Sequence, residues 1–270
     1  MGWKRLYNLL GMGNLKIEYW LYGLITVMVV VFIWSLIFMH KKPKYKTIAR
    51  DIVIVFALLA FLFFAKNYLF QRRNYHFNIE EIPAYQNEAY VEINQNIPLF
   101  SKQDYYWEEG KLQFSELDSL GRCGIAYAKL NTSLLPNKER EPLQKVKPSG
   151  WQTIRYDDLI EDKYLYNRCH LIAYELSSIN TEIKNLITGT RYLNLNMLPF
   201  ENEVAYYLRK EGKPVLYRVT PVFVGDELVA RGVLMEAESI EDDELSFCVY
   251  LYNVQPGIEI DYETGESKRK

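Results

Sequence analysis

A run of twenty-one residues without a formal charge, from Tyr19 to Met39, limits most strongly what this chain can fold into. About 20 apolar residues in a helix cross the roughly 30 Å hydrocarbon core of a bilayer. A second apolar run, from Ile52 to Ala65, reaches that length only if Lys66 extends toward the interface and residues 67–70 complete the last turns. We therefore predict two transmembrane helices, at about residues 19–39 and 52–70. An interfacial or buried helix is the alternative for the second run.

Lys and Arg are concentrated around these two runs. The loop at residues 40–51 carries five of them, the preceding tail carries three, and Arg72 and Arg73 follow the second run. Because the most basic short loop of a membrane protein stays in the cytoplasm, we expect both termini to lie outside. If the second run does not span, the C-terminal part would face the opposite side.

The charge of the chain is divided between two regions. Residues 1–73 contain eleven Lys and Arg and two acidic residues, whereas the remainder contains 21 basic and 32 acidic residues. The first region is therefore near +9 and the second near −11. We predict a membrane anchor at residues 1–73, a polar linker at 74–89 and a folded domain at 90–267. The acidic run at 236–244 is interpreted as a solvated turn between strands.

The folded domain reads as strands around one clear helix. Pro199 suits the first turn of a helix over 199–212, and Gly212 is its natural stop. The dipeptide Gly225–Asp226 predicts a hairpin. This pattern predicts an α+β fold with a mostly antiparallel sheet. Alternating or apolar runs predict its strands at 90–94, 124–130, 151–157, 164–172, 215–225, 227–239 and 246–254.

Cysteine usage leaves two possibilities open. The three cysteines, Cys123, Cys169 and Cys248, form no CxxC pair, so a zinc site of the usual spacing is absent from the sequence. An extracellular domain would hold one disulfide and one free thiol. Three buried thiols that act as small apolar side chains are the other possibility.

One group of polar residues interrupts an apolar stretch. Of the three histidines, only His170 lies inside the predicted folded domain, and Arg168 shares a strand face with it. Asn185, Asn194 and Glu201 follow along the chain. Hydrolysis of a phosphodiester needs such groups: a base for water, a cation for the developing charge, and oxygen ligands for a metal ion. Spacing alone does not select these residues, because a lone histidine in an apolar strand is usually a core residue.

The order Arg-x-His, KN at 184–185, Asn194 and a helix carboxylate resembles the DNA/RNA non-specific endonuclease family, whose signature is Asp-Arg-Gly-His. The chain is most similar to the membrane-anchored bacterial DNA-entry nucleases of that family. The resemblance runs from about Tyr90 to Ser267 and implies a ββα-metal nuclease core. Six stretches carry it: LDSLGRCGIAYA, KPSGWQT, YLYNRCHLIAYEL, KNLITGTRYLN, MLPFENEVA and YNVQPGIEIDYETGES.

The resemblance also implies a role for each matching residue. His170 looks like the general base that activates water. Asn194 looks like the one direct ligand of Mg²⁺, for which Mn²⁺ is an expected substitute. Arg168 and Arg122 resemble family positions that contact phosphate. Asn185 resembles the asparagine that orients the site, and Glu201 resembles the helix carboxylate that holds metal-bound water.

Three positions depart from the family pattern. Asn167 stands where the signature has Asp, which removes a negative charge near the site. Cys169 replaces Gly and so requires an ordinary backbone conformation there. Ala205 occupies a position where some relatives have arginine, and Arg191 or Arg209 would have to take its place. None of these changes removes the base or the metal ligand.

Two hypotheses of different class follow. The first is a Mg²⁺-dependent, sugar-non-specific endonuclease at the outer face of a cell membrane. Its substrates would be DNA and also RNA, and its partners the bilayer and a DNA-uptake machinery. Its role would be the uptake or degradation of DNA. The second is an inactive, membrane-anchored nucleic-acid-binding protein on the same fold. The acidic balance and the altered signature favour the second, since nucleic acids bind through Lys and Arg. The retained His170, Asn194 and Glu201 favour the first. A thiol enzyme built on Cys169 is a distant third, because the folded domain has no second histidine to act as its base.

Under the first hypothesis, basic residues must gather locally at the site. Eight of them lie within or near the motif region: Arg122, Lys129, Lys145, Lys147, Arg168, Lys184, Arg191 and Arg209.

Overall fold

The computed structural model describes residues 55, 78–140, 142–143 and 145–270. The predicted transmembrane helices at 19–39 and 52–70 therefore fall outside the described residues, apart from Val55. Within the part that is described, no helix combines the length and the apolar character needed to cross a bilayer. Residues 78 onward belong to one compact unit, Arg72–Lys270. The predicted boundaries of anchor, linker and folded domain stay predictions.

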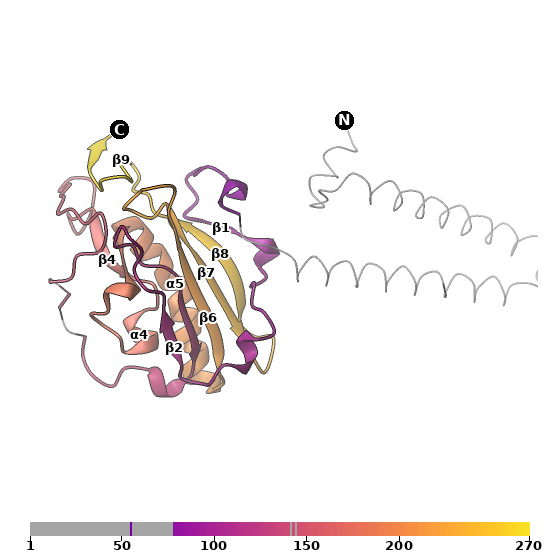
Figure 1. The fold of residues 1–270 in the computed structure, drawn as a ribbon. Helices are drawn as coiled ribbons and strands as arrows, with labels where there is room; N and C mark the ends of the chain where they lie inside the picture. Colours follow the sequence, from indigo (N-terminus) through magenta and orange to yellow (C-terminus); the bar gives the residue numbers. More distant parts are fainter. Residues whose placement is uncertain (1–54, 56–77, 141, 144) are drawn as a thin grey trace, which may run out of the picture. The chain divides into compact units, whose positions relative to one another are not determined.

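Six strands form the main sheet of this unit (Figure 1), in the order β1-β8-β7-β6-β3-β2. Every neighbouring pair is antiparallel, which confirms the predicted α+β class with a mostly antiparallel sheet. The strands are β1 Tyr90–Glu92, β2 Leu112–Phe114, β3 Ala126–Leu130, β6 Val215–Val222, β7 Gly232–Ser239 and β8 Ser246–Tyr252. A small pair, β9 Ile258–Ile260 and β10 Ser267–Arg269, lies near the C-terminus.

A second antiparallel pair leads directly into the long helix. Strands β4 Tyr166–His170 and β5 Leu186–Thr190 pair with each other, and α5 Arg191–Glu211 follows β5 without a loop. The Thr190 hydroxyl caps α5 by accepting a hydrogen bond of 2.9 Å from the backbone N–H of Leu193. Together they form a β-β-α unit, with the short helix α4 Tyr174–Ser177 inserted after β4.

The two faces of the main sheet are buried by different parts of the chain. Alternate residues of the strands, such as Val219, Met235 and Val249, pack against the apolar side of α5, including Val204 and Leu208. The opposite face packs under the N-terminal segment of the unit; Ile79, Ile82, Tyr85 and Leu99 cover a cluster around Tyr250. The β4–β5 pair and α5 thus lie together on one side of the sheet (Figure 1).

Several predicted elements differ from the observed ones. Helix α5 begins at Arg191 rather than at Pro199, so Pro199 lies inside the helix and not in its first turn. The predicted stop is confirmed, because Gly212 has a φ of 70° and donates its N–H to the Leu208 carbonyl at 3.1 Å. The predicted strand at 151–157 is wrong, since only an isolated bridge between Arg155 and Tyr164 forms there. Strand β5 was not among the predicted strands.

The hairpin between β6 and β7 exists with a longer connection than predicted. The two strands pair in an antiparallel register from Val215↔Ser239 to Val222↔Gly232, and residues 223–231 connect them. Strand β7 therefore starts at Gly232, not at residue 227. Glu236 also corrects the interpretation of 236–244 as a solvated turn, because it lies buried on β7 and pairs with Arg218 at 2.7 Å.

The cysteines are resolved in favour of the second possibility. Cys123, Cys169 and Cys248 are all free and buried.

The five short 3-10 helices among the described residues are η2 Ile79–Glu81, η3 Asn94–Asn96, η4 Asp104–Tyr106, η5 Thr132–Leu134 and η6 Ile183–Asn185.

Candidate active site

Two adjoining pockets lie against β4 and the first turns of α5. The smaller one, here the histidine pocket, has a volume of about 320 Å³ and is lined by Pro136, Arg140, His170, Ala173, Tyr174, Glu175, Asn194, Leu198 and Glu201. The larger one, here the aromatic pocket, has a volume of about 590 Å³ and is lined by Arg140, Leu143, Trp151, Thr153, Asp162, Tyr164, Tyr166, Asn167, Arg168, Arg191 and Asn194. Arg140 and Asn194 line both, so the two pockets meet at these residues.

His170 ends β4 at the wall of the histidine pocket, and both of its ring nitrogens have partners. Nε2 lies 2.9 Å from the Asn180 carbonyl oxygen, and Nδ1 lies 3.1 Å from the Arg140 guanidinium. A carbonyl only accepts and a guanidinium only donates, so the proton must be on Nε2 and the lone pair on Nδ1. The ring is thus held as one neutral tautomer whose basic nitrogen faces the pocket.

The environment of His170 keeps it neutral. The pKa of its imidazole is lowered to about 4, mainly by burial and also by the positive charge of Arg140, whereas the hydrogen bond to Asn180 opposes the shift. An imidazole in this state is unprotonated across the physiological pH range. It can therefore accept a proton at Nδ1, provided that Arg140 yields its position to a water molecule.

Arg140 is the residue that sequence reasoning missed. It lies exposed on the loop between β3 and β4, and its Nε also donates to the Asn180 side-chain oxygen at 3.3 Å. Its guanidinium borders both pockets, where a phosphate that approached His170 would meet it. The sequence offered no periodic signal for Arg140, because it stands in the loop-like tract NTSLLPNKEREPLQKVKPSG, between two glutamates and far along the chain from His170.

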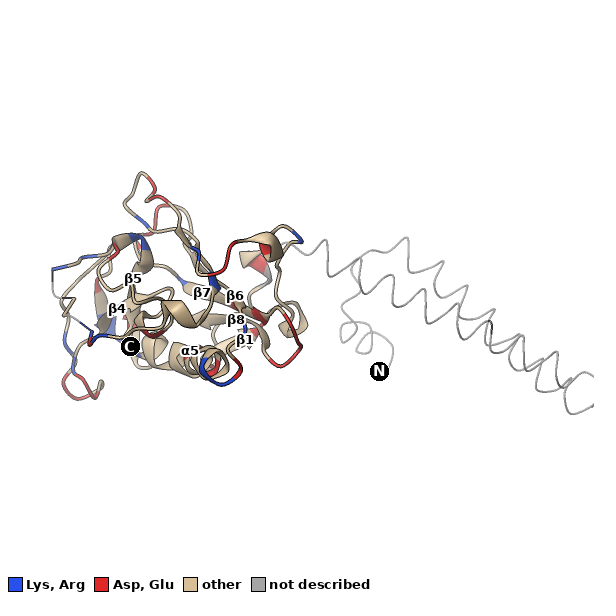
Figure 2. Ribbon diagram, turned by 90° about the horizontal axis from the view of Figure 1, so that it is seen from below, with Lys and Arg blue, Asp and Glu red and all other residues tan. Residues whose placement is uncertain are grey.

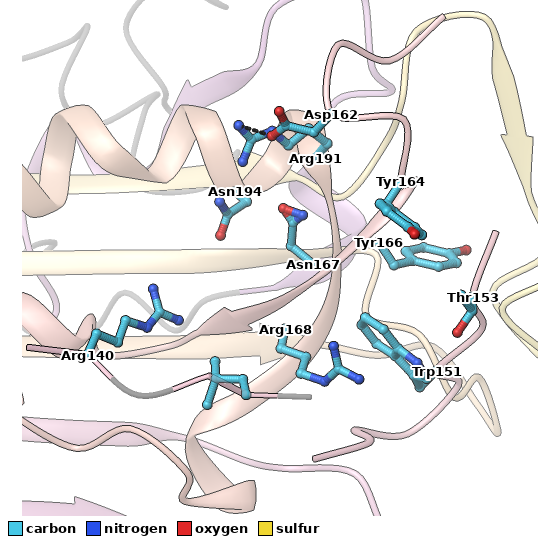
Figure 3. A pocket seen from close by; sticks show the side chains of 11 residues that line it. Arg140, Trp151, Thr153, Asp162, Tyr164, Tyr166, Asn167, Arg168, Arg191 and Asn194 are labelled. Atoms are coloured by element: carbon cyan, nitrogen blue, oxygen red, sulfur yellow. Dashed lines mark ion pairs between the residues drawn. The ribbon is translucent and has the colours of Figure 1, made fainter. Parts of the chain in front are cut away.

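Asn194 lies in the first turn of α5 and lines both pockets. Figure 3 shows its side chain among those that line the aromatic pocket. Its side-chain oxygen accepts a hydrogen bond from the Cys169 thiol at 3.3 Å. Cys169 itself is fully buried, and burial raises the pKa of its thiol well above the ordinary value. A neutral thiol donor orients the amide so that its oxygen keeps a second lone pair for another ligand.

Glu201 lies two turns further along α5 and lines the histidine pocket. Its side chain is only 9% exposed and receives no hydrogen bond from the described residues. Burial raises the pKa of its carboxyl to about 8; the charge of Glu175 adds to this rise and that of Arg140 opposes it. A cation bound beside this buried carboxyl group would stabilise its ionised form and so favour loss of its proton.

These groups fit a hard divalent cation. Asn194 and Glu201 supply oxygen donors on one helix beside a pocket, and Mg²⁺ keeps most of its waters, so few protein ligands suffice. Among the described residues, no cluster of three or more His, Cys, Asp and Glu side chains is close enough to hold a metal. The amide oxygen of Asn194 and the carboxyl oxygens of Glu201 are the kind of donor that a largely hydrated, hard ion takes.

Arg168 and His170 face different pockets. The Arg168 guanidinium lies over the Trp151 ring, with 3.9 Å from its central carbon to the ring centre, and Nε donates to the Val146 carbonyl. Asn167 and Arg168 both line the aromatic pocket, on the far side of Asn194 from the base. Arg168 thus lines a different pocket from His170, and the two pockets share Arg140 and Asn194.

Asn185 lies behind the base and away from both pockets. Its side-chain oxygen accepts from the Ile172 N–H and its amide donates to the Ile172 carbonyl, each at 2.9 Å. Its own carbonyl accepts from the Leu171 N–H at 2.9 Å. Asn185 is completely buried, so it ties down the two residues after His170 and orients the end of β4.

Arg122 is not brought to the pockets. It pairs with Asp118 at 2.7 Å and donates to the carbonyls of Gly225 and Glu227 at 2.7 and 3.0 Å, so it joins two loops. Arg191 and Arg209, considered as replacements for the arginine that some relatives have at position 205, form ion pairs as well. Arg191 binds Asp162 at the aromatic pocket, and Arg209 binds Glu175 at 2.8 Å beside the histidine pocket.

Comparison with known proteins concerns the family and the fold. Residues 101–241 match the DNA/RNA non-specific endonuclease family. The fold is similar to that of NucA from Streptococcus agalactiae, whose structures without metal and with magnesium bound give TM-scores of 0.61 and 0.62 at 25% identity, over 76% of this chain and 95% of NucA. The Sda1 nuclease with bound zinc matches with a TM-score of 0.50 at 28% identity, over 59% of this chain and 81% of Sda1.

A curated relative matches a shorter part of the chain. A deoxyribonuclease of Streptococcus dysgalactiae subsp. equisimilis is 33% identical over 110 residues, which is 38% of this chain. The chain spans about a third of the length of that relative, 33%.

Proposed function

Because the chain belongs to the DNA/RNA non-specific endonuclease family, we propose that it hydrolyses internal phosphodiester bonds of DNA, and also of RNA, in a Mg²⁺-dependent reaction. The observation that carries the proposal is the His170 ring. Its Nε2–H is held by the Asn180 carbonyl, and its basic Nδ1 faces a pocket that also holds an arginine, an amide oxygen and a buried carboxylate.

In this proposal the substrate phosphate draws Arg140 away from His170. The guanidinium then pairs with the phosphate oxygens, and a water molecule takes its place at Nδ1. His170 accepts the proton of that water as the oxygen attacks phosphorus, while Asn180 stabilises the imidazolium through Nε2. Arg140 and Arg168 complement the negative charge that grows on the phosphate oxygens.

Asn194 and Glu201 are the residues that would hold the metal ion, directly or through its waters. A bound Mg²⁺ supplies positive charge that polarises the phosphate and stabilises the leaving oxygen. NucA has been solved with magnesium and Sda1 with zinc, which supports a divalent ion in this chain too. Cleavage without sugar specificity is consistent with a site built from groups that address phosphate and not the 2′ position.

The same proposal places the nuclease at the outer face of a cell membrane. It rests on the predicted spans at residues 19–39 and 52–70 and on the basic loop between them. In that position the enzyme would act on extracellular DNA, during uptake or degradation. Treatment of intact cells that express the protein with an added protease, followed by detection of the C-terminal domain, tests whether this domain lies outside the cell. Loss of the domain is expected, and full protection of the domain would contradict the proposed location.

Cleavage of supercoiled plasmid tests the activity itself. We expect nicking with Mg²⁺ or Mn²⁺ and none with EDTA, and we expect Asn194→Ala and Glu201→Gln to lower the rate at least about a hundredfold, in the range seen for single catalytic groups. Tyr106→Ala, an exposed residue outside both pockets, is the matched control and should cut like the wild type. A wild-type chain that shifts DNA on a gel but does not cut it would favour the inactive binding protein.

A further inference from the structure

The mechanism leaves most of the aromatic pocket without a role. One end of it adjoins the histidine pocket at Arg140 and Asn194. The other end is lined by the rings of Trp151, Tyr164 and Tyr166, as Figure 3 shows. A strand whose scissile phosphate lies at Arg140 would therefore carry its neighbouring nucleotide toward three aromatic rings.

These rings differ in how firmly they are held. Tyr166 is buried, and its hydroxyl donates to the Gly265 carbonyl at 2.9 Å. Trp151 is partly buried and packs against the small apolar cluster that contains Tyr166, and the Arg168 guanidinium lies over one face of its ring. Tyr164 is 46% exposed, so much of its side chain is open to solvent. The Arg155 guanidinium lies 5.2 Å from the centre of the Tyr164 ring. The pocket thus combines a rigid wall with one accessible ring.

Beyond the arginines that face the phosphate, the groups that line the pocket suit a flat ligand with hydrogen-bonding edges. Asn167 presents an amide, which both donates and accepts, where the family signature has a carboxylate. Asp162 is paired with Arg191 and so adds no uncompensated charge. The volume of about 590 Å³ lies in the range of sites for small organic ligands. Aromatic rings and guanidinium planes are the surfaces on which unpaired bases stack.

We propose that the aromatic pocket binds the unpaired base of a nucleotide next to the scissile phosphate, stacked against Tyr164 and the Trp151–Arg168 pair. This inference rests on the proposed function and names the form of nucleic acid that the site prefers. A base inside a duplex has to leave its stack before it enters such a pocket, which costs free energy. The enzyme therefore cuts single-stranded or locally opened nucleic acid faster than closed duplex.

The test uses the full chain, purified in detergent, and a fluorescent single-stranded DNA oligonucleotide. A second oligonucleotide has the same sequence with one central base removed. Cleavage rates at the bonds next to that position are compared by denaturing gel under single-turnover conditions. Tyr164→Ala removes the ring, Tyr164→Phe keeps it, and Tyr106→Ala, also an exposed tyrosine but outside the pockets, is the control.

For the wild type, we expect removal of the base to slow cleavage of an adjacent bond about tenfold, within the range of base–aromatic stacking. Tyr164→Ala should cut the intact oligonucleotide about tenfold more slowly and lose the distinction between the two substrates. It should also reduce the preference for single strand over duplex. Tyr164→Phe and Tyr106→Ala should behave like the wild type. Equal rates of wild type and Tyr164→Ala on the intact strand would overturn the inference.

A binding measurement separates this inference from the proposed function. In EDTA, fluorescence anisotropy reports the affinity of the wild type and of Tyr164→Ala for the same two oligonucleotides without cleavage. A wild type that cuts nothing but still binds the intact strand about tenfold more tightly than the abasic strand would contradict the enzyme and support the base site. A wild type that cuts both strands equally and binds them equally would do the reverse.

Discussion

The proposed role of His170 as a base depends on two neighbours, which lie ten and thirty residues away in the sequence. The Asn180 carbonyl accepts the Nε2 proton and thereby assigns the lone pair to Nδ1, which the Arg140 guanidinium contacts. The pKa of about 4 keeps the ring neutral, although a weaker base also has less drive to remove a proton from water. At neutral pH the His170 ring is therefore in the neutral form that can accept a proton, but it is a weaker base than an ordinary histidine.

Titration of His170 by NMR tests this environment. We expect its pKa well below the ordinary 6.5, near 4, and we expect Arg140→Ala to raise it, because one of the two causes that lower it is removed. The unfolded chain then binds the histidine proton before the folded chain does. The contribution of His170 to the free energy of unfolding is therefore present above pH 6.5 and is lost as the pH falls toward 4. A pKa near 6.5 in the wild type would show that the ring is not enclosed as described.

Cys169 and Gly189 form a second dependent pair. A Cβ added at Gly189 would lie 2.3 Å from the Cys169 sulfur and 2.9 Å from its Cβ. Gly189→Ala should therefore lower the free energy of unfolding by about 1–3 kcal/mol, as overpacking does. In a Cys169→Gly background the same change should cost clearly less. Urea unfolding of residues 72–270 of the wild type, the two single variants and the double variant measures the coupling energy between Cys169 and Gly189. An equal cost of Gly189→Ala in both backgrounds would contradict the contact.

At the residue scale, the sequence identified candidates but not their partners. His170, Asn194 and Glu201 were found because the motif order resembles a family, and all three line one pocket. Arg122 was chosen as a phosphate contact because it precedes the motif, but its side chain joins two loops. Arg140 was missed because a side chain delivered by an irregular loop leaves no periodic pattern in the sequence.

The β-β-α unit is the element that assembles the site. Strand β4 carries Arg168 and His170, and α5 carries Asn194 and Glu201, with β5 connecting the two. The helix could be predicted only in part from the sequence. Its apolar spacing and Gly212 gave the end, but Pro199 suggested a start that the Thr190 cap overrides. Strand β5, LITGT, shows no alternation of apolar and polar residues and has a glycine as its fourth residue, so its sequence does not indicate a strand.

Asn185, which lies just before β5, and Asn194 of α5 should respond differently to substitution. Asn185→Ala leaves the N–H and the carbonyl of Ile172 buried without partners, so it should lower the free energy of unfolding by about 2–4 kcal/mol. Asn194→Ala removes a partly exposed amide, so it should change stability by less than about 1 kcal/mol while it abolishes cleavage. Thermal and urea unfolding together with the plasmid assay separate the two effects. A stable Asn185→Ala variant would refute its orienting role.

The charge of the whole folded unit works against its proposed substrate. The chain from residue 74 onward is near −11, yet nucleic acid requires a positive surface. Several basic residues of the motif region are already engaged, since Lys129 is buried against two carbonyls and Lys184 pairs with Glu116. Figure 2 shows Lys and Arg on the loops beside β4 and β5. There, Lys145 and Lys147 lie exposed on the segment that also contacts Arg168 through Val146.

Salt dependence of DNA binding tests whether these lysines supply the local charge. Each contact with a phosphate contributes a slope of about −0.9 to the plot of log affinity against log salt. Lys145→Gln combined with Lys147→Gln should weaken binding in EDTA and make the slope shallower by roughly two. The same pair of changes at Lys102 and Lys111, exposed residues that line neither pocket, is the matched control and should leave the slope unchanged. If both pairs act alike, the charge is not localised.

The measurement that tests the central claim most directly is chemical rescue of His170→Ala in the plasmid assay. With Mg²⁺ present, this variant should be inactive and should recover nicking in proportion to added imidazole, because the free base enters the space that the side chain leaves beside the pocket. Asn194→Ala should not respond to imidazole. Nicking by His170→Ala at the wild-type rate without imidazole would contradict the account, because His170 would then not be the base.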